Sequence, residues 1–146
     1  NGSDAPGVVV YNAALMESDG LLTSSLERLE HAHAVNVVGA IATAQAVVPA
    51  MRAAGAGTLL YTGGGLADSP EPTIATLSLG KVALRAMTTM LATELSKENI
   101  HAASVTVNGR VAPGTAFDPD HIADFYWEIH SQPRQQWRSE HRFDGR

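Results

Sequence analysis

Residues 77–84 have the sequence Leu-Ser-Leu-Gly-Lys-Val-Ala-Leu, and the run continues to residue 95 as Arg-Ala-Met-Thr-Thr-Met-Leu-Ala-Thr-Glu-Leu. We expect a long helix over about residues 74–96. Apolar runs typical of buried parallel strands precede it at residues 58–62 and follow it at residues 105–107. Strands that alternate with helices indicate a parallel α/β sheet with right-handed crossovers.

A further strand and helix are expected before this region. The apolar run at residues 8–12 predicts the first strand. Ser24 and Glu27 form a capping box, which predicts a helix that continues to about Arg52. Pro49 should weaken or kink the last turn of that helix.

The C-terminal part is expected to form one more helix. Asp118 is the predicted N-cap and Pro119 the first helical residue, in a helix that ends near His130. The expected organisation is one domain over residues 1–146, with a flexible stretch at 1–7 and a C-terminal helix and tail at 118–146.

Composition excludes several classes of protein. The chain has 146 residues, 45% of them hydrophobic, and a formal net charge of −5. This charge gives no reason to expect binding to nucleic acid or to an anionic membrane. The absence of Cys excludes disulfides and thiolate metal sites and fits a cytoplasmic location. No apolar run approaches about 18 residues, so we expect no membrane-spanning helix.

Five segments resemble, in order and at matching spacing, the motifs of the short-chain dehydrogenase/reductase family. They are VVVYNAA at residues 8–14, VNVVG at 35–39, GTLLYTGGGLA at 57–67, LSLGK at 77–81 and VTVNG at 105–109. Tyr11, Ala14 and Asn108 depart from the family's pattern. The resemblance implies an α/β, Rossmann-like doubly wound parallel sheet, incomplete at its N-terminus, and descent from NAD(P)-dependent oxidoreductases that act on a carbonyl or alcohol.

The resemblance also implies which catalytic groups are present. In the family, a Tyr phenol exchanges the substrate proton, a Lys lowers the pKa of that phenol and binds the nicotinamide ribose, a Ser steadies the substrate oxygen, and an Asn holds a water. Lys81 and Asn36 match, but Leu77 stands at the Tyr position and Gly64 at the Ser position. The cofactor contacts implied by the family fall on Asn12, Ala13, Lys81 and Gly109.

Neighbouring hydroxyls are poor substitutes for the phenol. Ser78 and Thr76 point about 100° away from the direction of Leu77 on a helix. Thr62 lies two residues before Gly64 and can share its face, but an alcohol is a weaker proton donor than an activated phenol. Tyr61 should point to the opposite face of the sheet.

A nucleotide cofactor is implied by the family alone. NAD or NADP would need glycines that lead from a strand into a helix N-terminus, and we find no such unit, because Gly63-Gly64-Gly65 leads into the loop at residues 68–72. The chain also begins without Met and at what resembles the family's fourth strand. We therefore expect an incomplete molecule that binds no cofactor by itself.

The retained residues also have purely structural interpretations. Lys81 can be a solvated or cleft-lining residue, and the Asn36 amide can satisfy a carbonyl at a break in its helix. The six His residues lie on diverging or separate elements, so we expect no metal site. The aromatic group of Tyr126, Trp127, Trp137 and Phe143 fits packing or a subunit contact better than a ligand lid.

Three functions remain open. The first is a degenerate family member, inactive or impaired as this chain. The second is a divergent oxidoreductase completed by a missing N-terminal half. The third is an oligomerisation or regulatory module, since the family pairs the helices equivalent to residues 24–52 and 74–96 into a homodimer or homotetramer. Small residues on these helices, among them Ala40, Ala44, Ala83, Ala86 and Ala92, would permit close approach of helices.

Overall fold

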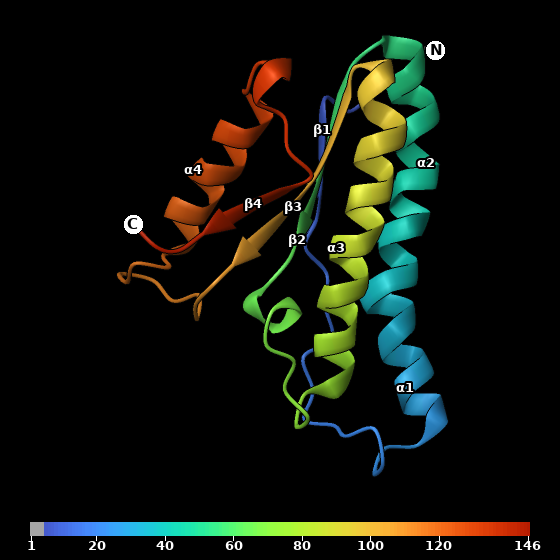
Figure 1. Ribbon diagram of the computed structural model, residues 1–146, viewed down its shortest axis with the longest axis vertical. Coiled ribbons are helices and arrows are strands. Elements are labelled where there is room, and N and C mark those ends of the chain that lie inside the picture. Colours follow the sequence, from blue (N-terminus) through green and yellow to red (C-terminus); the bar gives the residue numbers. More distant parts are fainter. Residues whose placement is uncertain (1–4) are drawn as a thin grey trace.

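The computed structural model describes residues 5–146, which form a four-stranded sheet with helices on both faces (Figure 1). The strands are β1 (Val8–Tyr11), β2 (Gly57–Thr62), β3 (Ile100–Val107) and β4 (Glu140–Phe143), in this order and all parallel. The expected parallel α/β sheet is confirmed. β4 was not expected, because it lies in the segment interpreted as a tail. Residues 1–4 of the predicted flexible stretch lie outside the described residues.

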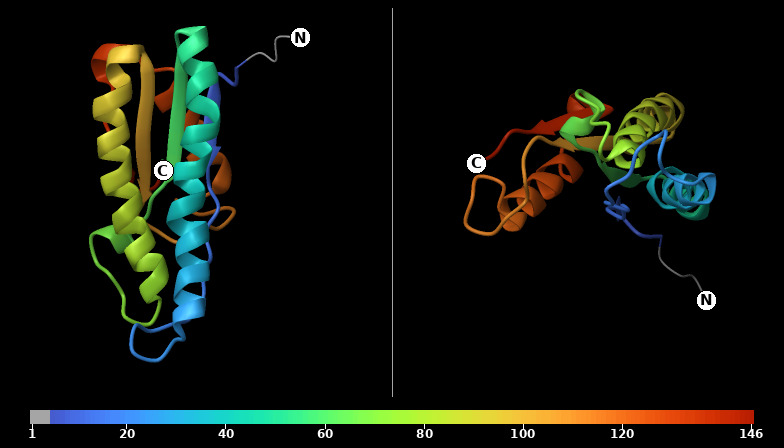
Figure 2. Two further views of the ribbon diagram at one scale, coloured as in Figure 1. Left: turned by 90° about the vertical axis from the view of Figure 1, so that its right-hand side faces the viewer. Right: turned by 90° about the horizontal axis from the view of Figure 1, so that it is seen from below.

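Two long helical segments cover one face of the sheet (Figure 2). The first consists of α1 (Leu26–His33), the π-helical turn η1 (Ala34–Val38) and α2 (Gly39–Ala54), and the second is α3 (Ala75–Leu95). Buried side chains from α2, α3, β2 and β3 form the core on this face. Its members include Ala40, Ala44, Met51, Leu59, Tyr61, Leu84, Met87 and Ile100.

The ends of these helices differ from expectation in two places. Ser25, and not Ser24, is the N-cap of α1, because its hydroxyl accepts a hydrogen bond from the Arg28 amide at 3.3 Å. The Ser24 hydroxyl instead accepts one from the Gly20 amide. The helix also continues through Pro49 to Ala54, and its one irregular turn is η1.

The irregular turn η1 is supported by Tyr11, a departure from the family's pattern. The Tyr11 hydroxyl donates a hydrogen bond to the Val35 carbonyl at 2.6 Å. Any side chain at Gly39 would overlap this hydroxyl. Tyr11 and Gly39 therefore form a matched pair that joins the end of β1 to the helix.

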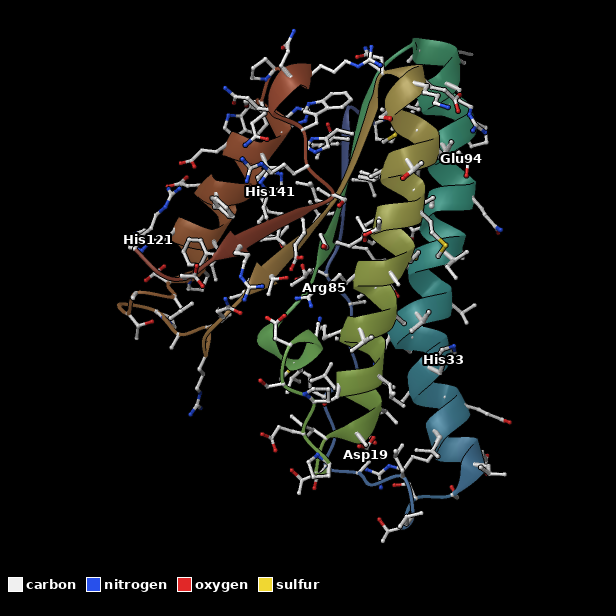
Figure 3. All side chains as sticks on the ribbon, viewed as in Figure 1. Asp19, His33, Arg85, Glu94, His121 and His141 are labelled. Carbon is white, nitrogen blue, oxygen red and sulfur yellow. The ribbon has the colours of Figure 1, made fainter. Side chains whose placement is uncertain are left out.

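Asp19 supplies the cap that α3 lacks in its own sequence. One carboxylate oxygen of Asp19 accepts from the Thr76 amide at 3.1 Å and the other from the Thr76 hydroxyl. Figure 3 shows Asp19 at the lower end of α3. Carboxylates at a helix N-terminus satisfy free amides and oppose the positive end of the helix dipole. This contact fixes the loop after β1 beside the start of α3.

The last helix, α4 (Pro119–His130), lies on the opposite face, where it packs on Leu60, Ala103 and Val105. Asp118 caps it through the Asp120 amide at 2.9 Å, as the sequence predicts. The three connections all advance one strand in the same direction, but only the last places its helix on this face. The β3–α4–β4 crossover therefore has the opposite hand to the first two. The expectation that every crossover is right-handed is wrong for this reason.

By length and composition alone, the helical stretch Leu26–Ala54 could span a membrane, because an 18-residue window within it has a mean hydropathy of 1.6. The sequence was not expected to contain such a stretch. Core helices of globular proteins pass the same test, so the result is weak evidence for a membrane segment.

Candidate functional site

A cleft of about 1170 Å³ lies at the carboxyl ends of β1, β2 and β3, bounded by α4 and the start of α3. Ligands of open α/β sheets bind outside this edge. Residues chosen from the sequence that line it are Asn12, Gly64, Leu77, Lys81 and Gly109. Ala13 and Asn36 do not line it, so the cleft unites most but not all of the predicted site.

Lys81 is held inside the cleft wall. Its Nζ donates a hydrogen bond to the backbone carbonyl of Thr62 at 2.7 Å. Burial lowers the pKa of Lys81. The side chain is therefore a cleft-lining ammonium with a fixed partner, which excludes the solvated alternative.

Leu77 and Gly64, at the positions where the resemblance puts the Tyr and the Ser, line the cleft with Lys81. Leu77 is only 6% exposed and contributes an apolar surface to the cleft. Gly64 has an extended backbone, with a φ of −176°, that any residue can adopt. A Cβ placed on it would lie 3.7 Å from Lys81 Cε, an ordinary contact distance. The cleft therefore has room for a small side chain at position 64 beside Lys81.

Asn36 has a structural role in this fold. Its Oδ1 accepts from the Leu15 amide at 2.7 Å and its Nδ2 donates to the Leu15 carbonyl at 3.3 Å. It is 2% exposed and lies within η1, against Gly80 of α3. The amide thus binds the loop after β1, whereas the structural alternative considered from the sequence was a carbonyl of its own helix.

Gly109 is explained by packing. A Cβ at this position would overlap the ring of Phe117. The preceding residue, Asn108, donates from Nδ2 to Asp144 Oδ1 at 2.5 Å and from its amide to the Phe143 carbonyl at 3.0 Å. The turn after β3 is therefore tied to the C-terminal segment after β4.

Ion pairs fix the loop that follows the glycine turn. Asp68 contacts Arg142 of β4 and Arg85 of α3, both at 2.8 Å. Hydrogen bonds from Arg142 and then Arg85 lower the pKa of Asp68 to about 2. Figure 3 shows Arg85 on the side of α3 that faces β4. These contacts hold the cleft edge between α3 and the sheet.

Sequence reasoning missed the contribution of α4 to the site. Tyr126 lines the cleft, and its hydroxyl lies 2.7 Å from Thr62 Oγ1, which donates to Asn12 Oδ1 at 2.6 Å. The available signal was the helical spacing of Ile122, Tyr126 and Ile129, which places Tyr126 on the face of α4 toward the sheet.

The other aromatic residues of the C-terminal group serve different purposes. Trp137 stacks on the buried His101 ring, with centroids 4.7 Å apart, and Phe143 is part of the core. Trp127 also lines the cleft and is 64% exposed. Trp137 and Phe143 therefore serve packing, whereas Tyr126 and Trp127 line the cleft.

Few polar side chains line the cleft near the ends of the strands. Lys81, Asn12, Thr62 and Tyr126 are among them. Within residues 5–146, the glycine turn leads only into the short η2 (Gly65–Ala67) and a loop, so no helix amides are aimed at a pyrophosphate. The described residues also contain no group of three or more potential metal ligands.

Comparison with known proteins assigns the family. The model for the short chain dehydrogenase family matches residues 7–117, so the chain belongs to the short-chain dehydrogenase family. A comparison with curated protein sequences gives no match.

Solved structures of this family share the fold. A metagenomic short-chain oxidoreductase in complex with NADP is 28% identical, with a TM-score of 0.80, and the match covers 92% of this chain and 60% of that one. A short-chain dehydrogenase from Rhodopseudomonas palustris is 22% identical, with a TM-score of 0.83 and coverages of 95% and 62%. A 3-oxoacyl-[acyl-carrier protein] reductase from Brucella melitensis with bound NAD is 20% identical, with a TM-score of 0.82 and coverages of 93% and 59%. The chain thus spans about three fifths of the length of these structures.

Proposed function

We propose that this chain is the nicotinamide and substrate side of an NAD(P)-dependent oxidoreductase whose carbonyl or alcohol chemistry is impaired or lost. One observation supports the proposal. Lys81 donates to the Thr62 carbonyl, and four residues before it, where the family resemblance puts the phenol, the side chain is the buried and apolar Leu77. General acid–base catalysis is worth about 10² to 10⁴ in rate, so the loss of its proton donor leaves little of an ordinary turnover.

Hydroxyls near Leu77 do not replace the phenol. Ser78 donates to the Ile74 carbonyl at 3.1 Å and Thr76 is bound to Asp19, so both belong to the start of α3. Neither residue lines the cleft. Catalysis by either group would require this capped helix end to open.

The cofactor is part of the proposal. Members of the family bind NADP or NAD in the solved structures, and this chain offers the groups for the nicotinamide side. When bound, the nucleotide supplies the hydride. Lys81 and Asn12 would hold its ribose side, and its phosphates would need groups from outside residues 5–146. We place the protein in the cytoplasm on the same family grounds.

A second candidate, an oligomerisation or regulatory module, is favoured by the outer face of the two long helices. Large apolar side chains form a stripe there: Val38, Ile41, Leu79, Val82 and Met90 are 39–66% exposed. Side chains of this size rarely gather on a free surface unless a partner covers them. We propose a homodimer or homotetramer through this stripe.

The small residues expected to form that interface are only partly available. Ala40 and Ala44 are buried in the chain's own core and cannot meet a second chain. Ala86 is exposed between Val82 and Met90 on α3. The interface is therefore expected to be built from larger apolar side chains around Ala86.

Restoration of the lost groups tests the proposal. In the full-length protein that carries this chain, Leu77→Tyr with Gly64→Ser should raise ketone reductase activity at least a hundredfold, because the phenol then lies on the same helix as Lys81. Leu77→Phe with Gly64→Ala is the matched control, since it restores bulk without hydroxyls. Turnover of the unmodified protein at about 1–10³ s⁻¹ would contradict impaired catalysis. No nucleotide binding and no gain would leave the oligomerisation module as the function.

A further inference from the structure

A chain of hydrogen bonds crosses the cleft wall from β1 to α4. It begins at Asn12, at the end of β1, passes through the Thr62 hydroxyl at the end of β2, and ends at the Tyr126 hydroxyl. The two contacts, 2.6 Å and 2.7 Å, join residues 50 and 64 positions apart in the sequence. Most of the surrounding wall is apolar, including Val8, Leu60 and Ile122. The three polar groups are thus a built feature of that wall.

The proton positions in this chain determine what Tyr126 offers to a ligand. A hydroxyl has one proton, and Asn12 Oδ1 can only accept, so Thr62 donates to Asn12. Thr62 can then only accept from Tyr126, and the Tyr126 proton is engaged. The phenol oxygen of Tyr126, a residue of the cleft lining, therefore keeps a free lone pair. In this arrangement, Tyr126 is an acceptor for an N–H or O–H group.

The phenol is suited to recognition and not to proton transfer. Burial raises the pKa of Tyr126 to about 12, and the hydrogen bond with Thr62 opposes this shift only in part. The group therefore stays neutral near pH 7. A neutral, desolvated acceptor favours an uncharged donor, because a charged ligand group would lose its hydration there.

The surroundings favour a flat heteroaromatic amide. Trp127 follows Tyr126 on α4, lines the same cleft and is 64% exposed; its ring packs on one side against His130, with centroids 5.2 Å apart, and adds an aromatic surface to the cleft. Lys81 is bound to the carbonyl of Thr62, whose hydroxyl holds Tyr126. Thr62 therefore contacts both Lys81, on the side of the cleft assigned to the ribose, and Tyr126, on the side considered for the amide.

We propose that Tyr126, anchored by Thr62 and Asn12, accepts a hydrogen bond from the carboxamide N–H of a bound nicotinamide nucleotide. Tyr126 is a residue for ligand recognition on α4, separate from the positions of the lost catalytic groups. This inference rests on the proposed function, because it requires that the full-length protein binds such a nucleotide.

Binding measurements with two nucleotides test the inference. Tyr126→Phe in the full-length protein should weaken the binding of NADH or NADPH about threefold to tenfold, the range of one neutral hydrogen bond. Tyr126→Phe should weaken the binding of NAD or NADP by the same factor. It should not weaken the binding of the oxidised 3-acetylpyridine analogue, which has a methyl group in place of the amide nitrogen. Calorimetric titration or fluorescence gives the dissociation constants without any need for turnover.

Tyr61→Phe is the matched control. It removes the same hydroxyl from a buried tyrosine on the other face of β2, where that hydroxyl has no hydrogen-bond partner. Its nucleotide affinity should equal that of the unmodified protein. Thr62→Val keeps the shape of the side chain and removes the hydroxyl that anchors Tyr126, so it should also weaken nucleotide binding. It provides the test if Tyr126→Phe fails to fold.

The outcomes separate the two proposals. Nucleotide binding that neither Tyr126→Phe nor Thr62→Val alters would overturn this inference and leave the proposed function in place. A Tyr126→Phe loss of equal size with the 3-acetylpyridine analogue would also overturn it, because the amide N–H would then not be the donor. No binding by the unmodified full-length protein would overturn the proposed function and this inference together.

Discussion

Gly64 and Lys81 face each other across the cleft wall, so that a Cβ on Gly64 would lie 3.7 Å from Lys81 Cε. The distance is that of ordinary van der Waals contact. Gly109 provides the opposite case, because a Cβ there would overlap the Phe117 ring. Position 64 therefore has room for a side chain, whereas packing against Phe117 leaves none at position 109.

This difference predicts the stability of two variants. Gly64→Ser should change the free energy of unfolding by no more than about 0.5 kcal/mol, since it fits without strain. Gly109→Ala should cost about 1–3 kcal/mol, because the Phe117 ring must move from its place against Phe143. Urea unfolding of both variants checks the prediction, and equal losses would contradict it.

Nucleotide binding by residues 1–146 alone is expected to be weak. The described residues present no amides to a pyrophosphate, which contributes much of the affinity in this fold. We expect a dissociation constant for NADPH or NADH above about 100 μM, which corresponds to about −5.5 kcal/mol. Calorimetric titration checks this. Tighter binding would show that residues other than a glycine-rich turn at a helix N-terminus hold the phosphate groups.

Ala86→Arg should disrupt self-association. Ala86 lies exposed in the apolar stripe of α3, and a guanidinium there would be desolvated at a two-fold interface. Gln135→Arg, at an exposed position on the connection after α4, is the control. Light scattering at high micromolar concentration should show a smaller mass for Ala86→Arg only. A monomeric unmodified protein would mean that the stripe is not a self-interface.

Stability should fall in mild acid because of His141. Burial, followed by the nearby His101 and Arg138, lowers the pKa of His141 to about 4. Figure 3 shows His141 between β4 and α4, where its ring is edge-on to Phe125. Below pH 6.5 the unfolded chain takes up a proton that the folded protein does not bind until about pH 4. The free energy of unfolding should therefore fall by about 1–2 kcal/mol, after allowance for solvent screening, as the pH drops from 6.5 to about 4.

His141→Phe should reduce this pH dependence without abolishing it, because phenylalanine does not titrate but the neighbouring His101, whose pKa burial also lowers, remains. His121→Phe, at an exposed position on α4, is the control and should keep the profile of the unmodified protein. Thermal unfolding from pH 7 to pH 4 measures both. Identical profiles for His141→Phe and the unmodified protein would place the titrating group elsewhere.

Elements with strong periodicity could be predicted from the sequence. The helix at residues 74–96 was confirmed as α3, and Asp118 and Pro119 start α4 as expected. β4 was missed because its sequence, Glu-His-Arg-Phe, carries three polar side chains and buries only Phe143 fully. A break in the helix near Asn36 was one interpretation of the sequence, but its π-helical form was not predicted, and the Tyr11 hydroxyl that bonds to this turn is 24 residues from Val35.

The candidate site was predictable only where motifs mark it. Lys81, Gly64 and Leu77 meet in the cleft because they belong to adjacent elements at fixed spacing. Tyr126 could not be assigned to it, because its position depends on which face of the sheet α4 covers. The sequence rule for crossovers gives the wrong face for that helix.

The reversed hand of the β3–α4–β4 crossover also bears on the order of folding. The helices α2 and α3 can pack on β2 and β3 while α4 is still unfolded, since the two cores occupy opposite faces. The contact between Thr62 and Tyr126 closes a loop of 64 residues, and such distant contacts form slowly. During synthesis from the N-terminus, α4 also leaves the ribosome after β1, β2 and β3. The wall that carries Tyr126 is therefore the last part of the cleft to become ordered, and a nascent chain stalled before Pro119 would have β1, β2 and β3 packed on one face only, without a closed ligand site.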